Sequence, residues 1–328
     1  MHNTGMRAIA GGDEPLNLVT VIILSYKNTD GVYTTLESVL SQIYPALEII
    51  IADDGTPGFD GEVAPLRRYI DEKKGQNIQN AIILHPRENK GTVKNINGAI
   101  RASHGEYVKL IGADDRFTHE RVIMDYVSYL VETGLSVCFG KMCAVTVEGK
   151  RLYNHRVCGR DFEALSSLTP VQMEQRLFKN NCLPAPAMFV KRSIFDEFGY
   201  FPESICLMED YPFVLNLSHN GVRIGLIDEV MIDYKLSGST STGNYNEQFF
   251  KDMMTIYEDY IFPNDTRYGM FQVVNNALQR AGCRYFLKKT GWSSMSAAQK
   301  TGLILSHFPF AAYDALLMLR RKLRLLGE

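Results

Sequence analysis

The sequence predicts an α/β fold built on a doubly wound, mainly parallel sheet. Strand-like apolar runs alternate with helical patterns over the first 120 residues, and the first run is apolar at nearly every position, as in a strand covered on both faces. Each run ends in polar residues, and ligands bind where parallel strands end. The chain has 328 residues, 45% of them hydrophobic, and a net charge of −2. This composition supports a sizeable core and argues against a protein that coats nucleic acid.

The alternation begins with a strand, a helix and a second strand. Residues 18–24 form an almost unbroken apolar run rich in β-branched residues, followed by Ser25 and Tyr26. Residues 31–42 carry apolar side chains at helical spacing, and residues 47–52 form the second apolar run. Parallel strands joined by a helix connect by a right-handed crossover, so the ends of the two strands should be neighbours.

The second strand runs directly into Asp53, Asp54 and Gly55. A carboxylate at Asp54 can accept hydrogen bonds from a nucleotide base or from ribose hydroxyls, and Gly55 lets the backbone turn tightly. The alternative is a plain turn between a strand and a helix. The binding interpretation gains weight because a second acidic pair follows at the same predicted edge of the sheet.

Two further strand and helix pairs continue the pattern. Helices are expected at 63–74 and 93–102, and strands at 81–84 and 106–111. Lys94 lies in the first turn of the helix at 93–102, where its ammonium and the helix dipole together favour phosphate. The alternative is an ordinary exposed lysine.

Two adjacent carboxylates, Asp114 and Asp115, follow the strand at 106–111, which Gly112 ends. Neighbouring anions repel each other, so their position at the mouth of a sheet indicates a bound cation, and oxygen ligands suit Mg²⁺ or Mn²⁺. A metal at this point would bind phosphates. The alternative is that the two residues cap the next helix.

The second half of the chain loses the regular alternation. Helices are expected at 122–132, 192–198 and 213–219, and an extended loop at 180–186 because Pro184 and Pro186 oppose a helix. Strands are expected at 137–140, 142–147, 187–190, 222–227 and 230–234. After residue 238 no further strand and helix units follow, and helices are expected at 247–260, 270–288 and 311–326.

A third acidic pair, Glu209 and Asp210, precedes the helix at 213–219. Anions are stable at a helix N-terminus, and capping explains one of the two acids at most. If Asp210 points into the crevice at the sheet edge, it is a natural general base for a hydroxyl group.

Several patterns typical of other functions are absent from the sequence. It contains neither G-x-G-x-x-G nor a P-loop motif. The six cysteines show no zinc-like spacing, which indicates reduced thiols. No run reaches the ~18 to 20 apolar residues of a transmembrane helix, and residues 1–17 lack the apolar block of a signal peptide. These absences predict a cytoplasmic protein.

Taken in order, the motifs at the strand ends resemble the family 2 glycosyltransferases of the GT-A fold, over roughly residues 18–240. The ordered set is specific although each motif alone is modest. Its members are Val19–Asn28, Glu48–Thr56, Asn89-Lys90-Gly91, Gly105-Glu106-Tyr107, Ala113-Asp114-Asp115 and Glu209-Asp210-Tyr211.

The resemblance implies an inverting hexosyltransferase-type enzyme that uses a nucleotide-diphosphate sugar, commonly a UDP-sugar. Leu24, Ser25, Tyr26, Asp54 and Gly55 would contact the nucleotide, with Tyr26 against the base. Lys94 would lie near the base and phosphates, and Asp114 would contact the ribose or the sugar. Asp115 would bind Mg²⁺ or Mn²⁺ on the diphosphate. Asp210 would deprotonate the acceptor hydroxyl, with Glu209 in support.

Three residues depart from the family pattern. Gly112 takes the first acidic place of the usual D-x-D-D arrangement, so the metal site rests on Asp114 and Asp115. Lys94 replaces a typical arginine and lacks its planar fork. Ser237 stands where many members carry a histidine that helps hold the diphosphate. These departures predict a weaker dependence on metal than is usual.

The resemblance also implies how the chain is divided. Residues 1–17 would be a flexible leader, 18–120 the nucleotide-sugar half, 121–240 the acceptor half and 241–328 a helical extension. Relatives that build surface polysaccharides such as lipopolysaccharide or capsule act on glycan or polyprenyl-diphosphate-linked acceptors at the cytoplasmic leaflet, which suggests a peripheral membrane enzyme.

The C-terminal end carries leucines at helical spacing with Arg320, Arg321, Lys322 and Arg324 around them. Such a basic amphipathic helix suits an anionic membrane surface. The alternative is that the leucines pack on the catalytic domain or on a second subunit in a homodimer.

Two rival functions differ from this interpretation. A sugar-phosphate nucleotidyltransferase also uses an α/β sheet and metal-bound carboxylates, but it would usually carry a Gly- and Arg-rich loop where this chain has Ser25-Tyr26-Lys27-Asn28. A catalytically inactive nucleotide-sugar-binding protein is the second rival, and retention of Asp115 and Asp210 argues against it.

Overall fold

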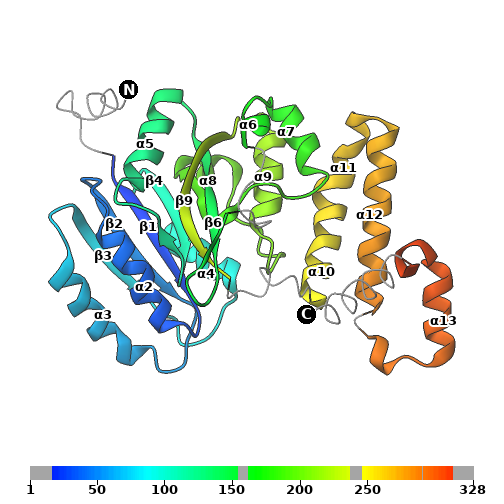
Figure 1. Ribbon diagram of the computed structural model, residues 1–328, viewed down its shortest axis with the longest axis horizontal. Helices are drawn as coiled ribbons and strands as arrows, with labels where there is room; N and C mark the ends of the chain where they lie inside the picture. Colours follow the sequence, from blue (N-terminus) through cyan, green and yellow to red (C-terminus); the bar gives the residue numbers. More distant parts are fainter. Residues whose placement is uncertain (1–16, 154–161, 237–245, 290, 313–328) are drawn as a thin grey trace. The chain divides into compact units, whose positions relative to one another are not determined.

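The computed structural model describes residues 17–153, 162–236, 246–289 and 291–312, which fall into two compact units (Figure 1). Of these residues, 17–203 and 209–236 form the first unit, and 204–208 together with those from 246 onward form the second. Every strand belongs to the first unit, and so do all of the predicted site residues.

Four neighbouring parallel strands form the first half of a nine-stranded sheet (Figure 1). Their order across the sheet is β3-β2-β1-β4, and the structure thereby confirms the predicted α/β fold with a mainly parallel sheet. The strands are β1 (Val19–Ser25), β2 (Leu47–Asp53), β3 (Ile78–Leu84) and β4 (Tyr107–Gly112).

The second half of the sheet mixes strand directions. β8 is antiparallel to both β4 and β6, β6 and β9 are parallel, and the short β5 and β7 pair with β9 and β6. Neither two-residue strand was predicted, because two residues carry no periodic signal. The strands are β5 (Arg116–Phe117), β6 (Val137–Val145), β7 (Arg151–Leu152), β8 (Met188–Lys191) and β9 (Gly225–Lys235).

Two pairs of predicted strands were wrong, because each pair is one continuous strand. The strands expected at 137–140 and 142–147 form β6, whose pairing with β9 shifts register around Lys141. Gly140 marks the place because a Cβ there would lie 2.4 Å from Met231 Cγ, so only glycine permits this approach of β9. Likewise, two exposed acids at 228 and 229 interrupt the apolar pattern of β9 without interrupting the strand.

The predicted helices of the first unit are present, and two further helices were missed. Helix α7 begins with a capping box between Thr169 and Gln172 and has Pro170 in its first turn, which is a start signal readable from sequence. The extended loop expected at 180–186 was wrong at its end, where one 3-10 turn covers Ala185–Ala187. The helices are α2 (Thr29–Leu40), α3 (Asp60–Lys73), α4 (Thr92–Arg101), α5 (Val122–Thr133), α6 (Phe162–Ser166), α7 (Pro170–Leu177), α8 (Ser193–Phe198) and α9 (Asp210–His219).

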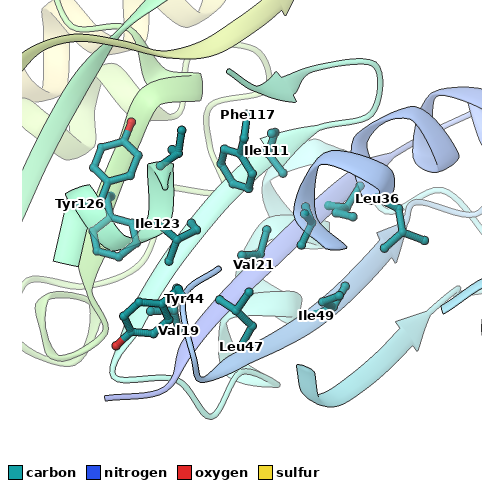
Figure 2. Packing of buried hydrophobic residues seen from close by; sticks show 14 of the residues in the cluster. Val19, Val21, Leu36, Tyr44, Leu47, Ile49, Ile111, Phe117, Ile123 and Tyr126 are labelled. Atoms are coloured by element: carbon teal, nitrogen blue, oxygen red, sulfur yellow. The ribbon is translucent and has the colours of Figure 1, made fainter. Parts of the chain in front are cut away.

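The core explains why the first two strands are apolar at consecutive positions. All seven residues of β2 are buried, and alternate residues of β1 and β2 pack in one cluster with α2 (Figure 2). Val21 of β1, Ile49 of β2 and Leu36 of α2 belong to this cluster and are fully buried. Such burial on both faces requires helices or loops over each side of the sheet.

The second unit is helical in the residues that the structure describes. The expected helices at 247–260 and 270–288 are present, the first with a π-helical end, whereas α13 was missed despite its capping box at Ser296 and Gln299. The helix expected at 311–326 falls almost wholly outside the described residues. The α-helices of the second unit are α10 (Glu247–Ile256), α11 (Phe262–Asp265), α12 (Met270–Lys289) and α13 (Ala297–Ser306). No helix among the described residues is long and apolar enough to cross a membrane.

One charged residue lies inside the apolar run of β2. Glu48 is 1% exposed, and its carboxylate accepts hydrogen bonds from Thr20 Oγ1 (2.8 Å), Asn80 Nδ2 (2.9 Å) and the His104 backbone N–H (2.8 Å). Burial alone would raise the pKa of Glu48, but the hydrogen bonds from His104, Thr20 and Asn80 outweigh it and lower the pKa below its ordinary value. The network joins β1, β2 and β3 near the N-terminal ends of these strands, away from the C-terminal ends where the predicted site lies.

We expect Glu48→Gln to lower the free energy of unfolding by about 1 to 3 kcal/mol at pH 7, because one acceptor oxygen becomes a donor among buried donors. The native pKa of Glu48 lies below the ordinary value of 4.5. Its ionised form therefore stabilises the fold above about pH 4.5, and that contribution is lost as the pH falls through the native pKa. Denaturant unfolding of wild type and Glu48→Gln from pH 7 to pH 3 should show the difference in their free energies of unfolding becoming smaller. A difference that does not depend on pH would contradict this account.

Candidate active site

The four parallel strands end side by side, as the sequence predicts. In the paired register Ser25 lies opposite Asp53, and Leu24 lies opposite Gly112. The residues that follow β3, β2, β1 and β4 therefore share one edge of the sheet. This edge holds every predicted nucleotide-sugar residue and the predicted metal ligand.

The segment after β1 places an exposed aromatic ring beside buried backbone. The carbonyl of Ser25 accepts the Asp54 backbone N–H at 2.8 Å, which joins the ends of β1 and β2. Ser25 is 6% exposed, whereas the Tyr26 ring is 44% exposed. Next, Lys27 has a positive φ of 54°, and its N–H donates to Thr56 Oγ1 at 2.6 Å. An exposed ring on a backbone so fixed can stack on a planar ligand.

The two acids that end β2 have different partners. Asp53 Oδ2 accepts the Thr56 backbone N–H at 2.7 Å and its Oδ1 accepts the Thr56 hydroxyl at 2.6 Å, so Asp53 shapes the turn. Asp54 is 3% exposed, and its Oδ1 accepts the Lys90 backbone N–H at 2.8 Å. The Asp54 carboxylate thus ties the end of β2 to the residues that follow β3.

Gly55 is required where these two loops meet. Its φ is +76°, and a Cβ at this position would lie 2.4 Å from the carbonyl carbon of Glu88 and 2.5 Å from the backbone N of Asn89. Because both neighbours are backbone atoms, neither can move aside cheaply. The close approach brings Lys90 within reach of Asp54.

We expect Gly55→Ala to cost more stability than Gly58→Ala, its matched control. Gly58 has a similar φ of +83°, but a Cβ there meets nothing within 4 Å. The control should therefore cost about 1 to 2 kcal/mol for backbone strain alone, and Gly55→Ala should cost about 1 to 3 kcal/mol more from the clash. Denaturant unfolding of the two variants measures the difference, and equal losses would mean that the loops are not in contact.

Lys94 lies exposed in the first turn of α4, as predicted. The next residue, Asn95, donates from Nδ2 to the carbonyl of Ala52 at 2.9 Å, and Gly91 with φ +88° precedes the helix. These contacts fix the N-terminus of α4 against the end of β2. Its helix dipole and the Lys94 ammonium therefore both favour an anion at the strand ends.

The acid turn after β4 is held by two side chains that sequence reasoning missed. Asn28 donates from Nδ2 to Asp114 Oδ2 at 2.7 Å, and its own Oδ1 accepts the Gly31 backbone N–H as the cap of α2. Thr35, fully buried on α2, donates to the carbonyl of Asp115 at 2.8 Å. Asp114 adopts a φ of +84°, which a non-glycine residue holds only when its surroundings fix it.

Asp115 is the most deeply buried acid of this turn, at 6% exposed. Its Oδ1 accepts the Lys235 backbone N–H at 2.9 Å. Burial raises the pKa of Asp115 to about 7, while Lys235 and the charge of Lys109 oppose that rise. Among the described residues no cationic side chain forms an ion pair with Asp115. A buried carboxylate in this state fits a divalent cation. Ser237, which replaces a histidine typical of the family, lies outside the described residues.

A second group of metal-binding side chains is less suited to an ion. In the described part of the chain, His119, Asp125 and Glu229 bring ligand atoms within 4.8 Å of one another. However, His119 Nδ1 accepts the Arg121 backbone N–H at 3.3 Å, which places the ring proton on Nε2, the nitrogen facing Glu229 at 3.4 Å. The Arg121 guanidinium also pairs with Asp125 at 3.4 Å. With the ring proton on Nε2 and Asp125 paired with Arg121, two of the three groups are poor ligands for a cation.

The third acidic pair lies at the start of α9. Glu209 is the cap residue of the helix, and its side chain makes no capping hydrogen bond. Asp210 Oδ2 accepts Asn181 Nδ2 at 2.6 Å. Burial raises the pKa of Asp210, and the hydrogen bonds from Asn181 and from the backbone of Asp210 and Tyr211 oppose that rise. A carboxylate so balanced can both accept and release a proton.

Residues 20–199 match the family described as Glycosyl transferase family 2, which is more than half of the chain. Among curated proteins, an Escherichia coli UDP-Glc:alpha-D-GlcNAc-diphosphoundecaprenol beta-1,3-glucosyltransferase, WfaP, is 29% identical over 129 residues, which cover 36% of this chain and 48% of that protein. The chain spans 32% to 66% of the length of the first curated relatives it matches.

Solved structures share the fold. The Staphylococcus aureus TarS fragment 1–349 in complex with UDP-GlcNAc has a TM-score of 0.59 at 17% identity, over 88% of this chain and 79% of that one. The Pyrobaculum calidifontis mannosyltransferase PcManGT in complex with GDP-Man and Mn²⁺ has a TM-score of 0.55 at 16% identity, over 92% of this chain and 85% of that one. Both agree with a GT-A architecture for the first unit.

Proposed function

The chain belongs to glycosyl transferase family 2, and from that premise we propose that it transfers a sugar, with inversion, from a UDP-sugar to a hydroxyl group of a glycan or lipid-linked acceptor in surface polysaccharide synthesis. The observation that carries the proposal is the shared edge at which Tyr26, Asp54 and Asp115 follow three adjacent parallel strands. Ligands of open α/β sheets bind at such an edge.

The donor would lie across the strand ends with its base near β1 and β2. The exposed Tyr26 ring can stack on the base, and Asp54 keeps one carboxylate oxygen, Oδ2, in addition to the Oδ1 that accepts from Lys90. The N-terminus of α4 and Lys94 would attract the diphosphate. The UDP preference is supported by the donor named for WfaP and by the UDP-GlcNAc bound to TarS.

Asp115 would hold a Mg²⁺ or Mn²⁺ ion, with the charge of Asp114 beside it. When bound, such an ion neutralises the charge that develops on a leaving diphosphate. The Mn²⁺ present in the PcManGT complex supports this choice of cofactor. Asp114, held by Asn28, would keep its second oxygen for a hydroxyl of the ribose or of the sugar.

Asp210 would act as the general base, with Glu209 beside it. The Asn181 amide donates to Oδ2 and fixes the orientation of the carboxylate, which would take up the proton of an incoming hydroxyl group. A base that lies across the sugar carbon from the diphosphate makes the displacement in-line, and the anomeric centre is inverted. The acceptor named for WfaP, a diphosphoundecaprenol-linked sugar, supports a lipid-linked acceptor for this chain.

We expect Asp210→Asn to lower the rate of sugar transfer about 10²-fold or more, because the amide cannot take the proton of the hydroxyl group. Binding of UDP should be unchanged, since Asp210 contacts the acceptor side. Transfer is measured as UDP release from UDP-glucose and UDP-N-acetylglucosamine with an undecaprenyl-diphosphate-linked sugar, and binding as the rise in melting temperature with UDP. A variant as active as wild type would rule out Asp210, and a wild type that binds UDP without transfer would favour the inactive-binder alternative.

Gly112 offers a direct test of the metal site. A Cβ at Gly112 would lie 3.2 Å from Asp115 Oδ2, so a carboxylate there would adjoin the proposed ligand. Without metal, Gly112→Asp should melt at a lower temperature than Gly112→Asn, because the added carboxylate repels Asp115. With UDP and MnCl₂ the order should reverse, and half-saturation should need about tenfold less Mn²⁺, or about 1.4 kcal/mol. An order that stays the same with Mn²⁺ would contradict a cation at Asp115.

A further inference from the structure

A lysine is buried in the middle of the sheet, and no step of the proposed reaction uses it. Lys109 lies on β4 and is 0% exposed. Its Nζ donates to the carbonyl of Leu110 at 2.8 Å and to the carbonyl of Pro186. Among the described residues it has no ion-pair partner. Burying an ammonium against carbonyl groups is costly, and an apolar residue of similar size would usually be at least as stable.

A second buried side chain holds the neighbouring carbonyl. Tyr126 of α5 is 0% exposed, and its hydroxyl donates to the carbonyl of Ala187 at 2.8 Å. The Tyr126 ring stacks on Phe189 of β8 at a centroid distance of 4.9 Å, which keeps the hydroxyl in place. Lys109 and Tyr126 therefore hold two consecutive carbonyls, those of Pro186 and Ala187. We call these two side chains the carbonyl clamp.

The segment that the clamp holds begins at the partner of the proposed base. Asn181 Oδ1 accepts the Leu183 backbone N–H at 3.2 Å, so its Nδ2 is turned toward Asp210, to which it donates at 2.6 Å. Between Leu183 and the clamp, the Ala187 N–H donates to the carbonyl of Pro184 at 2.8 Å. A continuous series of hydrogen bonds and short covalent links thus runs from β4 and α5 to the Asp210 carboxylate.

We propose that Lys109 and Tyr126 are positioning residues for the transfer reaction: by holding the carbonyls of Pro186 and Ala187, they fix residues 181–187 so that Asn181 orients Asp210. This inference rests on the proposed role of Asp210 as the base. Because β4 also leads into Asp114 and Asp115, one strand sets both the acid turn and, through Lys109, the segment that orients the base.

The choice of lysine follows from this role. A neutral residue could fill the space, but only a long cationic side chain can reach a carbonyl of residues 181–187 from the centre of a strand and hold it strongly through a charge-assisted hydrogen bond. Burial lowers the pKa of Lys109 to about 7, and the charge of Asp115 opposes that fall. Misplacement of a catalytic group by about 1 Å costs on the order of 10²-fold in rate, so a firm anchor on this segment has a catalytic consequence.

The first test is a double-mutant cycle on transfer kinetics. Lys109→Met keeps the length of the side chain without its charge, and Asn181→Ala removes the amide that orients Asp210. Each single variant should lower kcat about tenfold or more, and in Asn181→Ala the donor KM should stay within about twofold, because Asn181 contacts the base and not the donor site. The double variant should be within about twofold of Asn181→Ala, since both changes break the same link. If the loss of kcat in the double variant equals the product of the two single losses, the proposal is overturned.

Glu48→Gln is the matched control for a buried charged residue. Glu48 lies on the same sheet, but its partners are Thr20 and His104, not residues 181–187. Glu48→Gln should lower stability, and Asn181→Ala should lower kcat by the same factor with or without it. Tyr126→Phe is the second clamp variant, and it removes one hydroxyl group without any change of charge. It should lower kcat about threefold to tenfold and also be non-additive with Asn181→Ala. It keeps the test open if Lys109→Met does not fold.

Hydrogen exchange tests the clamp without reference to activity. The Leu183 and Ala187 amides should exchange at least about tenfold faster in Lys109→Met and Tyr126→Phe than in wild type, and unchanged in Glu48→Gln. Unchanged exchange in both clamp variants would overturn the proposal. If wild type transfers no sugar from any UDP-sugar while the clamp variants loosen these amides, the proposed function fails and the anchoring of the segment stands.

Discussion

A carboxylate buried in a protein interior needs hydrogen-bond donors or charges to replace the water it loses, and this constraint shapes the whole edge of the sheet. The donors here are mostly backbone N–H groups: Lys90 donates to Asp54, and Lys235 donates to Asp115. Each donor comes from a segment distant in sequence from its acid, a loop for Lys90 and the end of β9 for Lys235. Holding the acids therefore also holds the loops, and the geometry of the candidate site and the stability of the fold depend on the same hydrogen bonds.

Glycine and amide residues make this arrangement sterically possible. Gly55 lets the backbone after β2 approach the backbone after β3, and Asn28 connects the end of β1 to Asp114 while capping α2. A larger residue at the first position or an apolar one at the second would separate loops that now touch. The site is thus a set of turns held at short range, on a rigid parallel sheet that needs no ligand to bring its strand ends together.

The sequence was sufficient to predict the parallel strands of the first half, because burial on both faces leaves unbroken apolar runs that are hard to misread. It was insufficient in the second half, where exposed acids within β9 and the register shift at Lys141 break the pattern of strands that are in fact continuous. Helices α7 and α13 were missed although both begin with capping boxes. The local signal was therefore present at the start of each helix.

For the candidate site, the sequence was sufficient to predict which acidic and basic residues lie at the strand ends. It was insufficient to predict the side chains that hydrogen-bond to them. Asn28 and Asp114 are 86 residues apart, and Asn181 and Asp210 are 29 apart, so no local pattern marks these pairs. Gly112 in place of an acid leaves Asp114 and Asp115 as the acids of this turn, and one of them already accepts from Asn28. Mg²⁺ is typically held by one or two carboxylates together with substrate phosphates. A turn with so few protein ligands is therefore suited to an ion that arrives with its diphosphate. When neither the ion nor the diphosphate is bound, the charge of Lys109 offsets part of the negative charge of Asp115.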